Sequence, residues 1–311
     1  MPLYASRRDV LEATGALAAT GGLMGCTGVI GDDDRVAVSS KRFTEQEILG
    51  YLAFEALDAT DIAVLDEIGL GGTAQNFEAL REGQVDLYWE YTGTAWLILP
   101  PEREEIIPDE DELLEAVREE FETEHGLTFL EPAPFSNGYV LTANPDWVEE
   151  TGIEAISQFA EHINDGNTDI DMVMNAEFAE RPDGWPGLIE HYDMAEAAGE
   201  LSIQTVDDEI VYQVVGEGEA DIGMGFDTDP RIVIFGLYLL EDDEEFFLSY
   251  NPAPLVSTDT LDQYPEMADV LNQIGPTFDT DLIRALNHEV AEEGRRAQEV
   301  AIEHLESEGI L

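Results

Sequence analysis

Aromatic side chains crowd residues 83–96, which read G-Q-V-D-L-Y-W-E-Y-T-G-T-A-W. Tyr91 ends an expected strand, and residues 92–94 follow it as an expected tight turn. In α/β proteins, ligands bind at such strand-to-turn corners. An aromatic face there suits a cation that accepts no hydrogen bonds, such as a quaternary ammonium. The alternative interpretation is that the aromatic residues fill the core. It is the favoured interpretation for Tyr88, Trp89 and Trp96.

The only lysine, Lys41, stands among 13 basic residues. It directly follows an expected strand at 35–40, so its ammonium group is a candidate ligand contact. The alternative is that it carries no functional role.

The chain is extremely acidic, with 70 Asp and Glu residues and a formal net charge of −57. A hydrophobic content of 44% with regular apolar periodicity argues against disorder. We therefore expect a folded protein with a hydrated acidic surface that needs salt to screen its self-repulsion. Nucleic acid is excluded as a partner because the sequence offers no basic patch.

The N-terminal 26 residues have the pattern of an export signal. Arg7-Arg8 form a twin-arginine pair, and a mildly apolar run follows them. Cys26, the single cysteine, comes after Leu-Met-Gly, which resembles a lipobox. We expect lipidation at Cys26, a tether at 27–34 and a location on the extracytoplasmic face of the cell membrane. An ordinary signal with an incidental cysteine is the alternative.

The remaining residues alternate between strand and helix patterns, which predicts an α/β architecture. A capping box at Thr44 and Glu47 is expected to open the first helix. We expect a discontinuous domain I at 35–138 plus 230–311 and a domain II at 139–229. The chain is expected to return to domain I with a strand at 233–237 and to end in three helices.

Several motifs occur in an order typical of one family. They are S-K-R-F-T-E-Q at 40–46, G-G-T at 71–73, A-L-R-E-G-Q-V-D-L-Y-W-E-Y-T-G-T at 79–94, F-S-N-G-Y at 135–139, R-P-D-G-W-P-G-L at 181–188, D-T-D at 227–229 and L-E-D-D-E-E-F-F-L-S-Y at 240–250. Over residues 36–311 the chain resembles the substrate-binding lipoproteins of ABC importers for glycine betaine, choline and related osmoprotectants, in a haloarchaeal-like form.

The resemblance implies a two-domain periplasmic-binding-protein fold, type II-like, with a hinge and an interdomain ligand cleft. It also implies an aromatic cage around the ligand's trimethylammonium head, with polar residues at the other end. The implied cage walls are Tyr91, Tyr139, Phe226 and Tyr250. The implied polar contacts are Lys41, Thr94, Asn137 and Arg181. For Arg181, a structural turn at residues 181–184 is an equal alternative.

Two positions depart from the family pattern. Phe226 stands where relatives tend to have Tyr, so a π face remains but any hydrogen bond through a hydroxyl is lost. Asn137 is Asp in some relatives, so this cage has less negative charge. Tyr192 and Tyr212 are expected in the core.

The implied function is capture of a quaternary ammonium solute and its delivery to ABC permease subunits, without enzymatic activity. No cofactor or metal is expected, because the five histidines show no metal-ligand spacing and are expected on solvated helix surfaces. Two alternatives stay open. The same fold could bind an anion or an amino acid, or the chain could be an exported α/β enzyme that uses acidic residues as acid and base.

Overall fold

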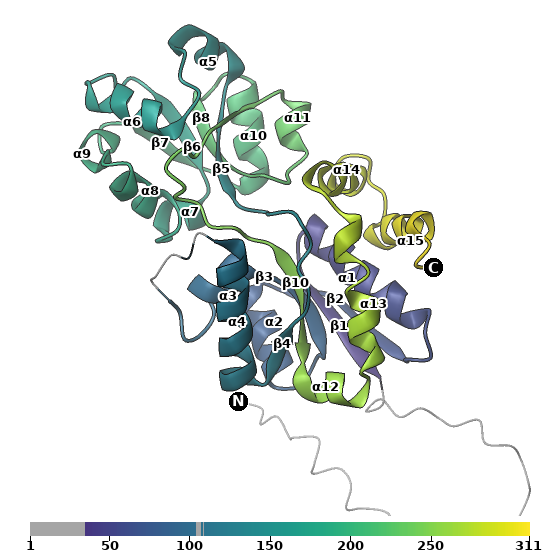
Figure 1. Cartoon of the computed structure of the whole chain (residues 1–311). Coiled ribbons are helices and arrows are strands. Elements are labelled where there is room, and N and C mark those ends of the chain that lie inside the picture. Colours follow the sequence, from purple (N-terminus) through teal and green to yellow (C-terminus); the bar gives the residue numbers. More distant parts are fainter. Residues whose placement is uncertain (1–34, 104–106, 108) are drawn as a thin grey trace, which may run out of the picture. The chain divides into compact units, whose positions relative to one another are not determined.

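The computed structural model describes residues 35–311 except 104–106 and 108. The expected signal, its Cys26 lipidation site and the tether at 27–34 lie outside these residues. Residues 35–311 form one compact unit that contains two five-stranded sheets (Figure 1). In the described part of the chain, no helix combines the length and the apolarity that a membrane span needs.

The first sheet is mostly parallel, with one antiparallel strand inserted near its edge. Its order is β2 (Val64–Gly71), β1 (Val36–Lys41), β3 (Leu87–Tyr91), β10 (Pro252–Ser257) and β4 (Leu127–Phe129). β1 runs parallel to β2 and β3, whereas β10 runs antiparallel to β3 and β4. Every residue of β1 and β3 is buried, because helices cover both faces of the sheet.

The second sheet repeats this pattern. Its order is β7 (Ser202–Thr205), β6 (Asp171–Met174), β8 (Ile222–Phe226), β5 (Tyr139–Ala143) and β9 (Tyr238–Leu240). β6 runs parallel to β7 and β8, and β5 runs antiparallel to β8 and β9. The chain enters β5 after it has formed β1–β4 of the first sheet, and it enters β10 after it has formed the second sheet.

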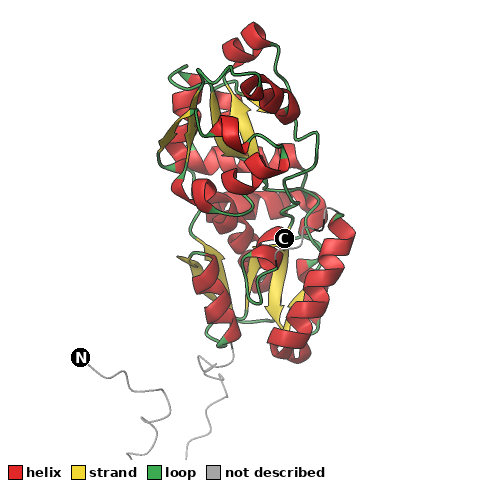
Figure 2. Ribbon diagram, turned by 90° about the vertical axis from the view of Figure 1, so that its left-hand side faces the viewer, coloured by secondary structure: helices red, strands yellow, loops and turns green. Residues whose placement is uncertain are grey.

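Helices lie against the strands of both sheets (Figure 2). Those between the strands of the first sheet are α1 (Thr44–Asp58), α2 (Thr73–Arg81), α3 (Thr92–Leu97) and α4 (Glu110–His125). Those that follow β5 are α5 (Pro145–Thr151), α6 (Ile156–Asn164), α7 (Ala176–Glu180), α8 (Trp185–His191), α9 (Ala195–Ala198), α10 (Asp208–Gly216) and α11 (Arg231–Ile234). Those that follow β10 are α12 (Thr258–Gln263), α13 (Glu266–Leu271), α14 (Thr280–Ala291) and α15 (Ala297–Glu308), with a short 3₁₀ turn at Gly275–Thr277.

Local sequence signals explain several helix ends. The side chain of Asp109 accepts a hydrogen bond from the Glu112 amide and opens α4. Gly126 then ends α4 in the left-handed conformation at φ 66°. The expected capping box at Thr44 is wrong: α1 starts after Phe43 without a side-chain cap, because Thr44 already lies inside the helix.

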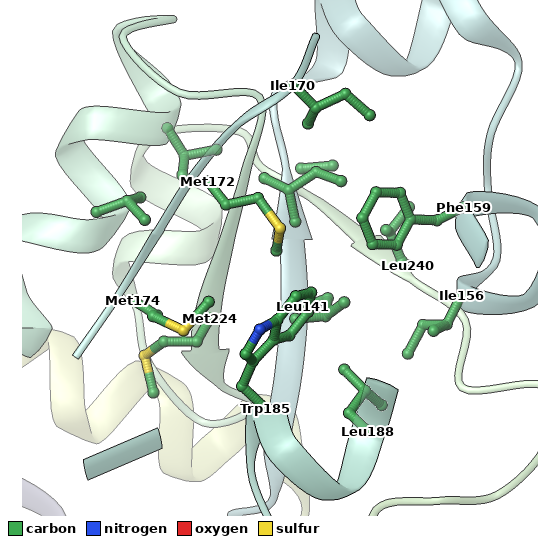
Figure 3. Close-up of a cluster of buried hydrophobic side chains, with 14 of the residues drawn as sticks. Leu141, Ile156, Phe159, Ile170, Met172, Met174, Trp185, Leu188, Met224 and Leu240 are labelled. Carbon is green, nitrogen blue, oxygen red and sulfur yellow. The ribbon is translucent and has the colours of Figure 1, made fainter. Parts of the chain in front are cut away.

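The cores follow the alternation of strand residues. Trp89 packs into one core cluster of the first sheet and Tyr88 into another, and both side chains are fully buried. Trp96 joins the cluster of Tyr88, so the core interpretation of these three aromatics is confirmed. Leu141, Met172 and Phe159 pack together in the core of the second sheet (Figure 3).

The stretch after Asp229 differs from the sequence expectation. Residues 231–234 form α11 rather than part of a strand, and β9 pairs with β5 of the second sheet. Ile232, Leu237 and Leu240 belong to the core of that sheet, so residues 230–240 do not rejoin the first sheet. The apolar run fits a short helix and a short strand equally well, and only tertiary pairing decides between them.

Two chain segments connect the sheets, one before β5 and one before β10. The Asn137 amide donates to the Tyr250 carbonyl at 3.1 Å, and the Tyr250 amide donates to Ser136 Oγ at 2.8 Å. The two connections therefore run side by side. The first residue of β10 pairs with the last residue of β3, and the first residue of β5 pairs with the last residue of β8.

Candidate functional site

A cavity of about 610 Å³ lies where these strand ends meet, which is within the usual range for small-ligand sites. Residues at the carboxyl ends of β1, β3 and β8 line it, as ligand sites in α/β folds do. All eight residues expected to contact ligand line this cavity. They are Lys41, Tyr91, Thr94, Asn137, Tyr139, Arg181, Phe226 and Tyr250.

Aromatic rings from separate segments face one another in the cavity. The ring of Tyr139 lies 5.1 Å from that of Phe226 at an interplanar angle of 30°, and 6.4 Å from that of Tyr250 at 75°. Tyr91 packs with Tyr250 in a small buried cluster. β5 and β8 bring Tyr139 and Phe226 together directly, because these two residues are paired across the strands.

Backbone features position the rings of Tyr250 and Phe226. A Cβ added at Gly93 would lie 2.9 Å from the ring of Tyr250, so glycine permits the close approach of that ring to α3. The Phe226 amide donates to the buried Tyr212 hydroxyl at 2.9 Å. Tyr212 thus supports the site from the core, as expected, and does not line the cavity.

The expected turn at residues 92–94 is instead the first turn of α3. The helix starts immediately after β3, and the Thr92 amide donates to the Asn251 carbonyl. Thr94 consequently sits on a buried helical turn, still at the cavity.

Lys41 is already paired with an acidic residue. Its Nζ lies 2.5 Å from Oε1 of Glu90, which is fully buried, and 5.0 Å from the centroid of the Tyr91 ring. Tyr88 donates its hydroxyl to the other Glu90 oxygen at 3.0 Å. This ion pair holds the Lys41 ammonium group at the cavity wall.

Arg181 belongs to the local turn and also lines the cavity. Its guanidinium forms ion pairs with Asp183 and with Glu177, which fix the local turn. The same group lies 5.6 Å from the centroid of the Tyr139 ring and lines the cavity. Burial raises the pKa of the Asp183 carboxyl, but the hydrogen bond and charge of Arg181 outweigh burial and hold that pKa below its ordinary value. Asp183 also accepts the Tyr250 hydroxyl at 2.5 Å.

Glu45 is a cavity residue that the sequence interpretation did not single out. It is 2% exposed and accepts hydrogen bonds from the Tyr91 hydroxyl at 2.7 Å and from the Asn137 and Asn287 side-chain amides at 3.0 and 3.1 Å. Burial raises the pKa of this carboxyl, and the donated hydrogen bonds partly oppose the shift. Its place in the T-E-Q motif was the available signal.

Phe43 is an aromatic cavity residue that the sequence interpretation also did not single out. Its ring stacks on Tyr91 at 6.3 Å and 15°, and it is 41% exposed at the cavity. It directly precedes α1 in the S-K-R-F-T-E-Q motif, in which only Lys41 was interpreted as a ligand contact.

The described residues contain no group of three or more His, Cys, Asp and Glu side chains arranged to hold a metal ion. The expectation that all five histidines lie on solvated surfaces is wrong for His304. Its ring is buried against Phe278, at 4.7 Å between centroids, and hydrogen-bonds to Thr277 Oγ1.

Two similarly wound sheets with a cavity at their strand ends define a periplasmic-binding-protein fold. Apo YehZ from Escherichia coli shares it with a TM-score of 0.72 at 26% identity, covering 89% of this chain and 99% of that one. The family described as the substrate binding domain of ABC-type glycine betaine transport systems matches residues 34–307, and the chain belongs to it.

Two relatives illustrate the range of this similarity. A chemotactic signal transduction system substrate-binding protein, CosB of Halobacterium salinarum, is 31% identical over 286 residues, covering 89% of this chain and 84% of CosB. A glycine-betaine-binding protein of Pseudomonas aeruginosa is 29% identical over 289 residues, covering 89% of each chain.

Proposed function

We propose that the cavity binds a quaternary ammonium solute such as glycine betaine, choline or carnitine. The observation that carries this proposal is that aromatic rings from separate segments, among them Tyr91, Tyr139, Phe226 and Tyr250, line one cavity. Such rings attract a cation that cannot form hydrogen bonds and is easily desolvated. Similar proteins support the same class of ligand, since two bear the names glycine-betaine-binding protein and carnitine transport binding protein.

The proposed roles follow from position. Tyr91, Tyr139, Phe226 and Tyr250 surround the trimethylammonium head. Thr94, Asn137, Lys41 and Arg181 meet the polar end. Lys41 and Arg181 each donate hydrogen bonds to an acidic neighbour. Their remaining N–H groups can donate to a ligand carboxylate or hydroxyl.

Contacts across the cavity rim support closure around the ligand. Arg284 of α14 donates to the Asp227 carbonyl at 2.7 Å, and Asn287 of the same helix donates to the Thr228 carbonyl at 3.2 Å. These bonds link the end of β8 to a helix that packs with α1 of the first sheet. We propose that they form in the closed state and that the ABC permease recognises this state. The expected domains stay part of this proposal, with domain II extended through β9.

Calorimetric titration tests the ligand class. Glycine betaine, choline, carnitine and proline betaine are titrated into the protein in molar KCl, alongside glutamate and sulfate. Saturable binding of at least one quaternary ammonium, with no heat from the two anions, is expected. Binding of an anion alone would overturn the proposal in favour of the same fold with another ligand. Recovery of chemically unchanged ligand distinguishes a receptor from an enzyme.

We further propose lipidation at Cys26 and tethering to the extracytoplasmic face of the cell membrane. The support is the twin-arginine pair followed by Leu-Met-Gly-Cys. Cys26→Ser should move the protein from the membrane fraction to the soluble one. An unmodified mature N-terminus elsewhere, measured by mass spectrometry, would refute the anchor.

A second candidate function is delivery of ligand occupancy to a chemotaxis receptor rather than to a permease. The similarity to a chemotactic substrate-binding protein favours it specifically. Deletion of the gene separates the two. Loss of labelled solute uptake supports the permease, and loss of attraction toward the solute with intact uptake supports the receptor.

A further inference from the structure

Glu45 places a buried carboxyl group at the cavity. It stands in the first turn of α1, where the helix N-terminus favours a carboxylate. Its hydrogen-bond partners Tyr91, Asn137 and Asn287 are all uncharged. No ion pair with Glu45 occurs among the residues that the structure describes. A buried carboxylate without a counter-charge costs free energy. A cation bound in the cavity would supply that counter-charge.

Three of the cations that line the cavity already pair with acidic residues. Lys41 pairs with Glu90, Arg181 pairs with Asp183 and Glu177, and Arg231 pairs with Asp229 and Glu292. Within the described chain, Glu45 is the only carboxylate that both lines the cavity and is buried. Arg42 also lines the cavity, but it is exposed and donates to the Gly69 and Leu70 carbonyls, so the buried charge beside the rings that lacks an opposite charge is negative.

The two amides around Glu45 add to this polarity. An ionised carboxylate only accepts hydrogen bonds, so Asn137 and Asn287 must both turn their NH₂ groups toward it. Their Oδ1 atoms are then left buried and without a hydrogen-bond partner in the described residues. Both residues line the cavity, so two unsatisfied electronegative oxygens accompany the carboxylate.

Tyr91 connects this charge to the aromatic wall. Its hydroxyl donates to Glu45, and its ring packs with Tyr250 in a small buried cluster. A phenol that donates to a carboxylate gains electron density, which makes its ring face more attractive to a cation.

We propose that Glu45 is a specificity-determining residue that makes the cavity select a positively charged head group over a neutral one of the same shape. It acts as the counter-charge of the bound cation, partly through the Tyr91 ring. This inference rests on the proposed function, because it assigns the charge selectivity of that same site.

The test compares each charged ligand with its neutral-headed carbon isostere. Choline is paired with 3,3-dimethylbutan-1-ol, and glycine betaine with 3,3-dimethylbutanoate. Each is titrated calorimetrically into the parent protein and into Glu45→Gln in molar KCl. Glu45→Gln is expected to lose about tenfold in affinity for the ammonium ligand, which is about 1.4 kcal/mol. Affinity for the isostere should change less than twofold.

A purely structural role for Glu45 gives a different result. Both members of a pair would then weaken by the same factor, and the inference would be wrong. Glu47→Gln is the matched control, because it removes the same charge from the same helical turn at a residue that does not line the cavity. It should leave the selectivity unchanged.

Tyr91→Phe keeps the test decisive if Glu45→Gln does not fold. It retains the ring and the carboxylate but breaks the link between them, so selectivity for the charged ligand should fall by a smaller factor. Unchanged selectivity in Tyr91→Phe overturns the role of the ring. If the parent protein binds no ammonium ligand, the proposed function fails first, and the two failures are therefore distinguishable.

Discussion

At the residue scale, the aromatic lining of the cavity was expected because Tyr91 ends a strand and because the family motifs imply Tyr139, Phe226 and Tyr250. Tyr91 and Tyr139 each adjoin a change from strand to loop or helix, where a side chain reaches a ligand. Glu45 was not predictable by the same logic. In a chain with 70 acidic residues, its place in the T-E-Q motif is a weak signal, and only burial and its hydrogen-bond partners distinguish it from the other carboxylates.

The polar contacts also needed the structure. The sequence presented Lys41 and Arg181 as candidate ligand contacts, with no functional role for Lys41 and a structural turn for Arg181 as the alternatives. Their buried acidic partners, Glu90 and Asp183, lie 49 and 2 residues away along the chain. Pairing at such varied separations follows from the fold and not from local spacing.

His304 makes a residue-scale prediction for pH. Burial lowers the pKa of its imidazole in the folded protein below the unfolded value. The neutral ring therefore contributes stability that is fully present above the unfolded pKa, near 6.5, and is lost as the pH falls through the lower folded pKa.

His304→Gln should reduce this dependence, because glutamine keeps a polar partner for Thr277 and does not titrate. Melting temperatures of both proteins between pH 8 and pH 5.5, in molar KCl, measure it. The parent protein should lose more stability over this interval, by up to about 1 kcal/mol. Parallel curves for the two proteins would contradict the assignment.

At the element scale, the sequence predicted β1, the end of β3 at Tyr91 and a helix that begins near Thr44, which correspond to observed elements of the first sheet. It failed at β9, where a run of apolar residues has no period that separates a strand from a helix. It also failed at α3, where Thr-Gly-Thr has turn chemistry. Packing under Tyr250 selects a helix instead.

The junction of β3 and α3 makes a prediction about Gly93. Gly93→Ala would place a methyl group 2.9 Å from the Tyr250 ring and from the Ser249 carbonyl oxygen. The ring has to move, so we expect ligand affinity to fall by about tenfold, or about 1.4 kcal/mol. Gly199→Ala, at a helix end with its nearest contact at 3.4 Å, is the control and should bind normally. Equal affinity in both variants would show that the position of Tyr250 does not matter.

At the scale of the whole molecule, charge dominates. A net charge of −57 repels itself across the surface, and the few arginines form ion pairs that compensate only a small part of it. The Debye length falls from about 10 Å at 0.1 M salt to about 3 Å at 1 M, so molar salt screens most of this repulsion.

The melting temperature should therefore rise markedly between dilute buffer and molar KCl. Sucrose at matched osmolarity serves as the control, since it stabilises folded proteins without screening charge. A melting temperature that does not change with KCl would contradict an electrostatic origin.

The central claim is that aromatic rings in the cavity bind a quaternary ammonium head group. Titration of glycine betaine and choline into the parent protein, Tyr91→Ala and Tyr88→Phe measures it most directly. Each desolvated ring contributes about 0.5–2 kcal/mol to cation binding. Tyr91→Ala should therefore weaken affinity by roughly threefold to thirtyfold, at about 1.4 kcal/mol per decade. Tyr88→Phe, which lies in the core, should bind nearly as the parent does. Unchanged affinity in Tyr91→Ala would contradict the account.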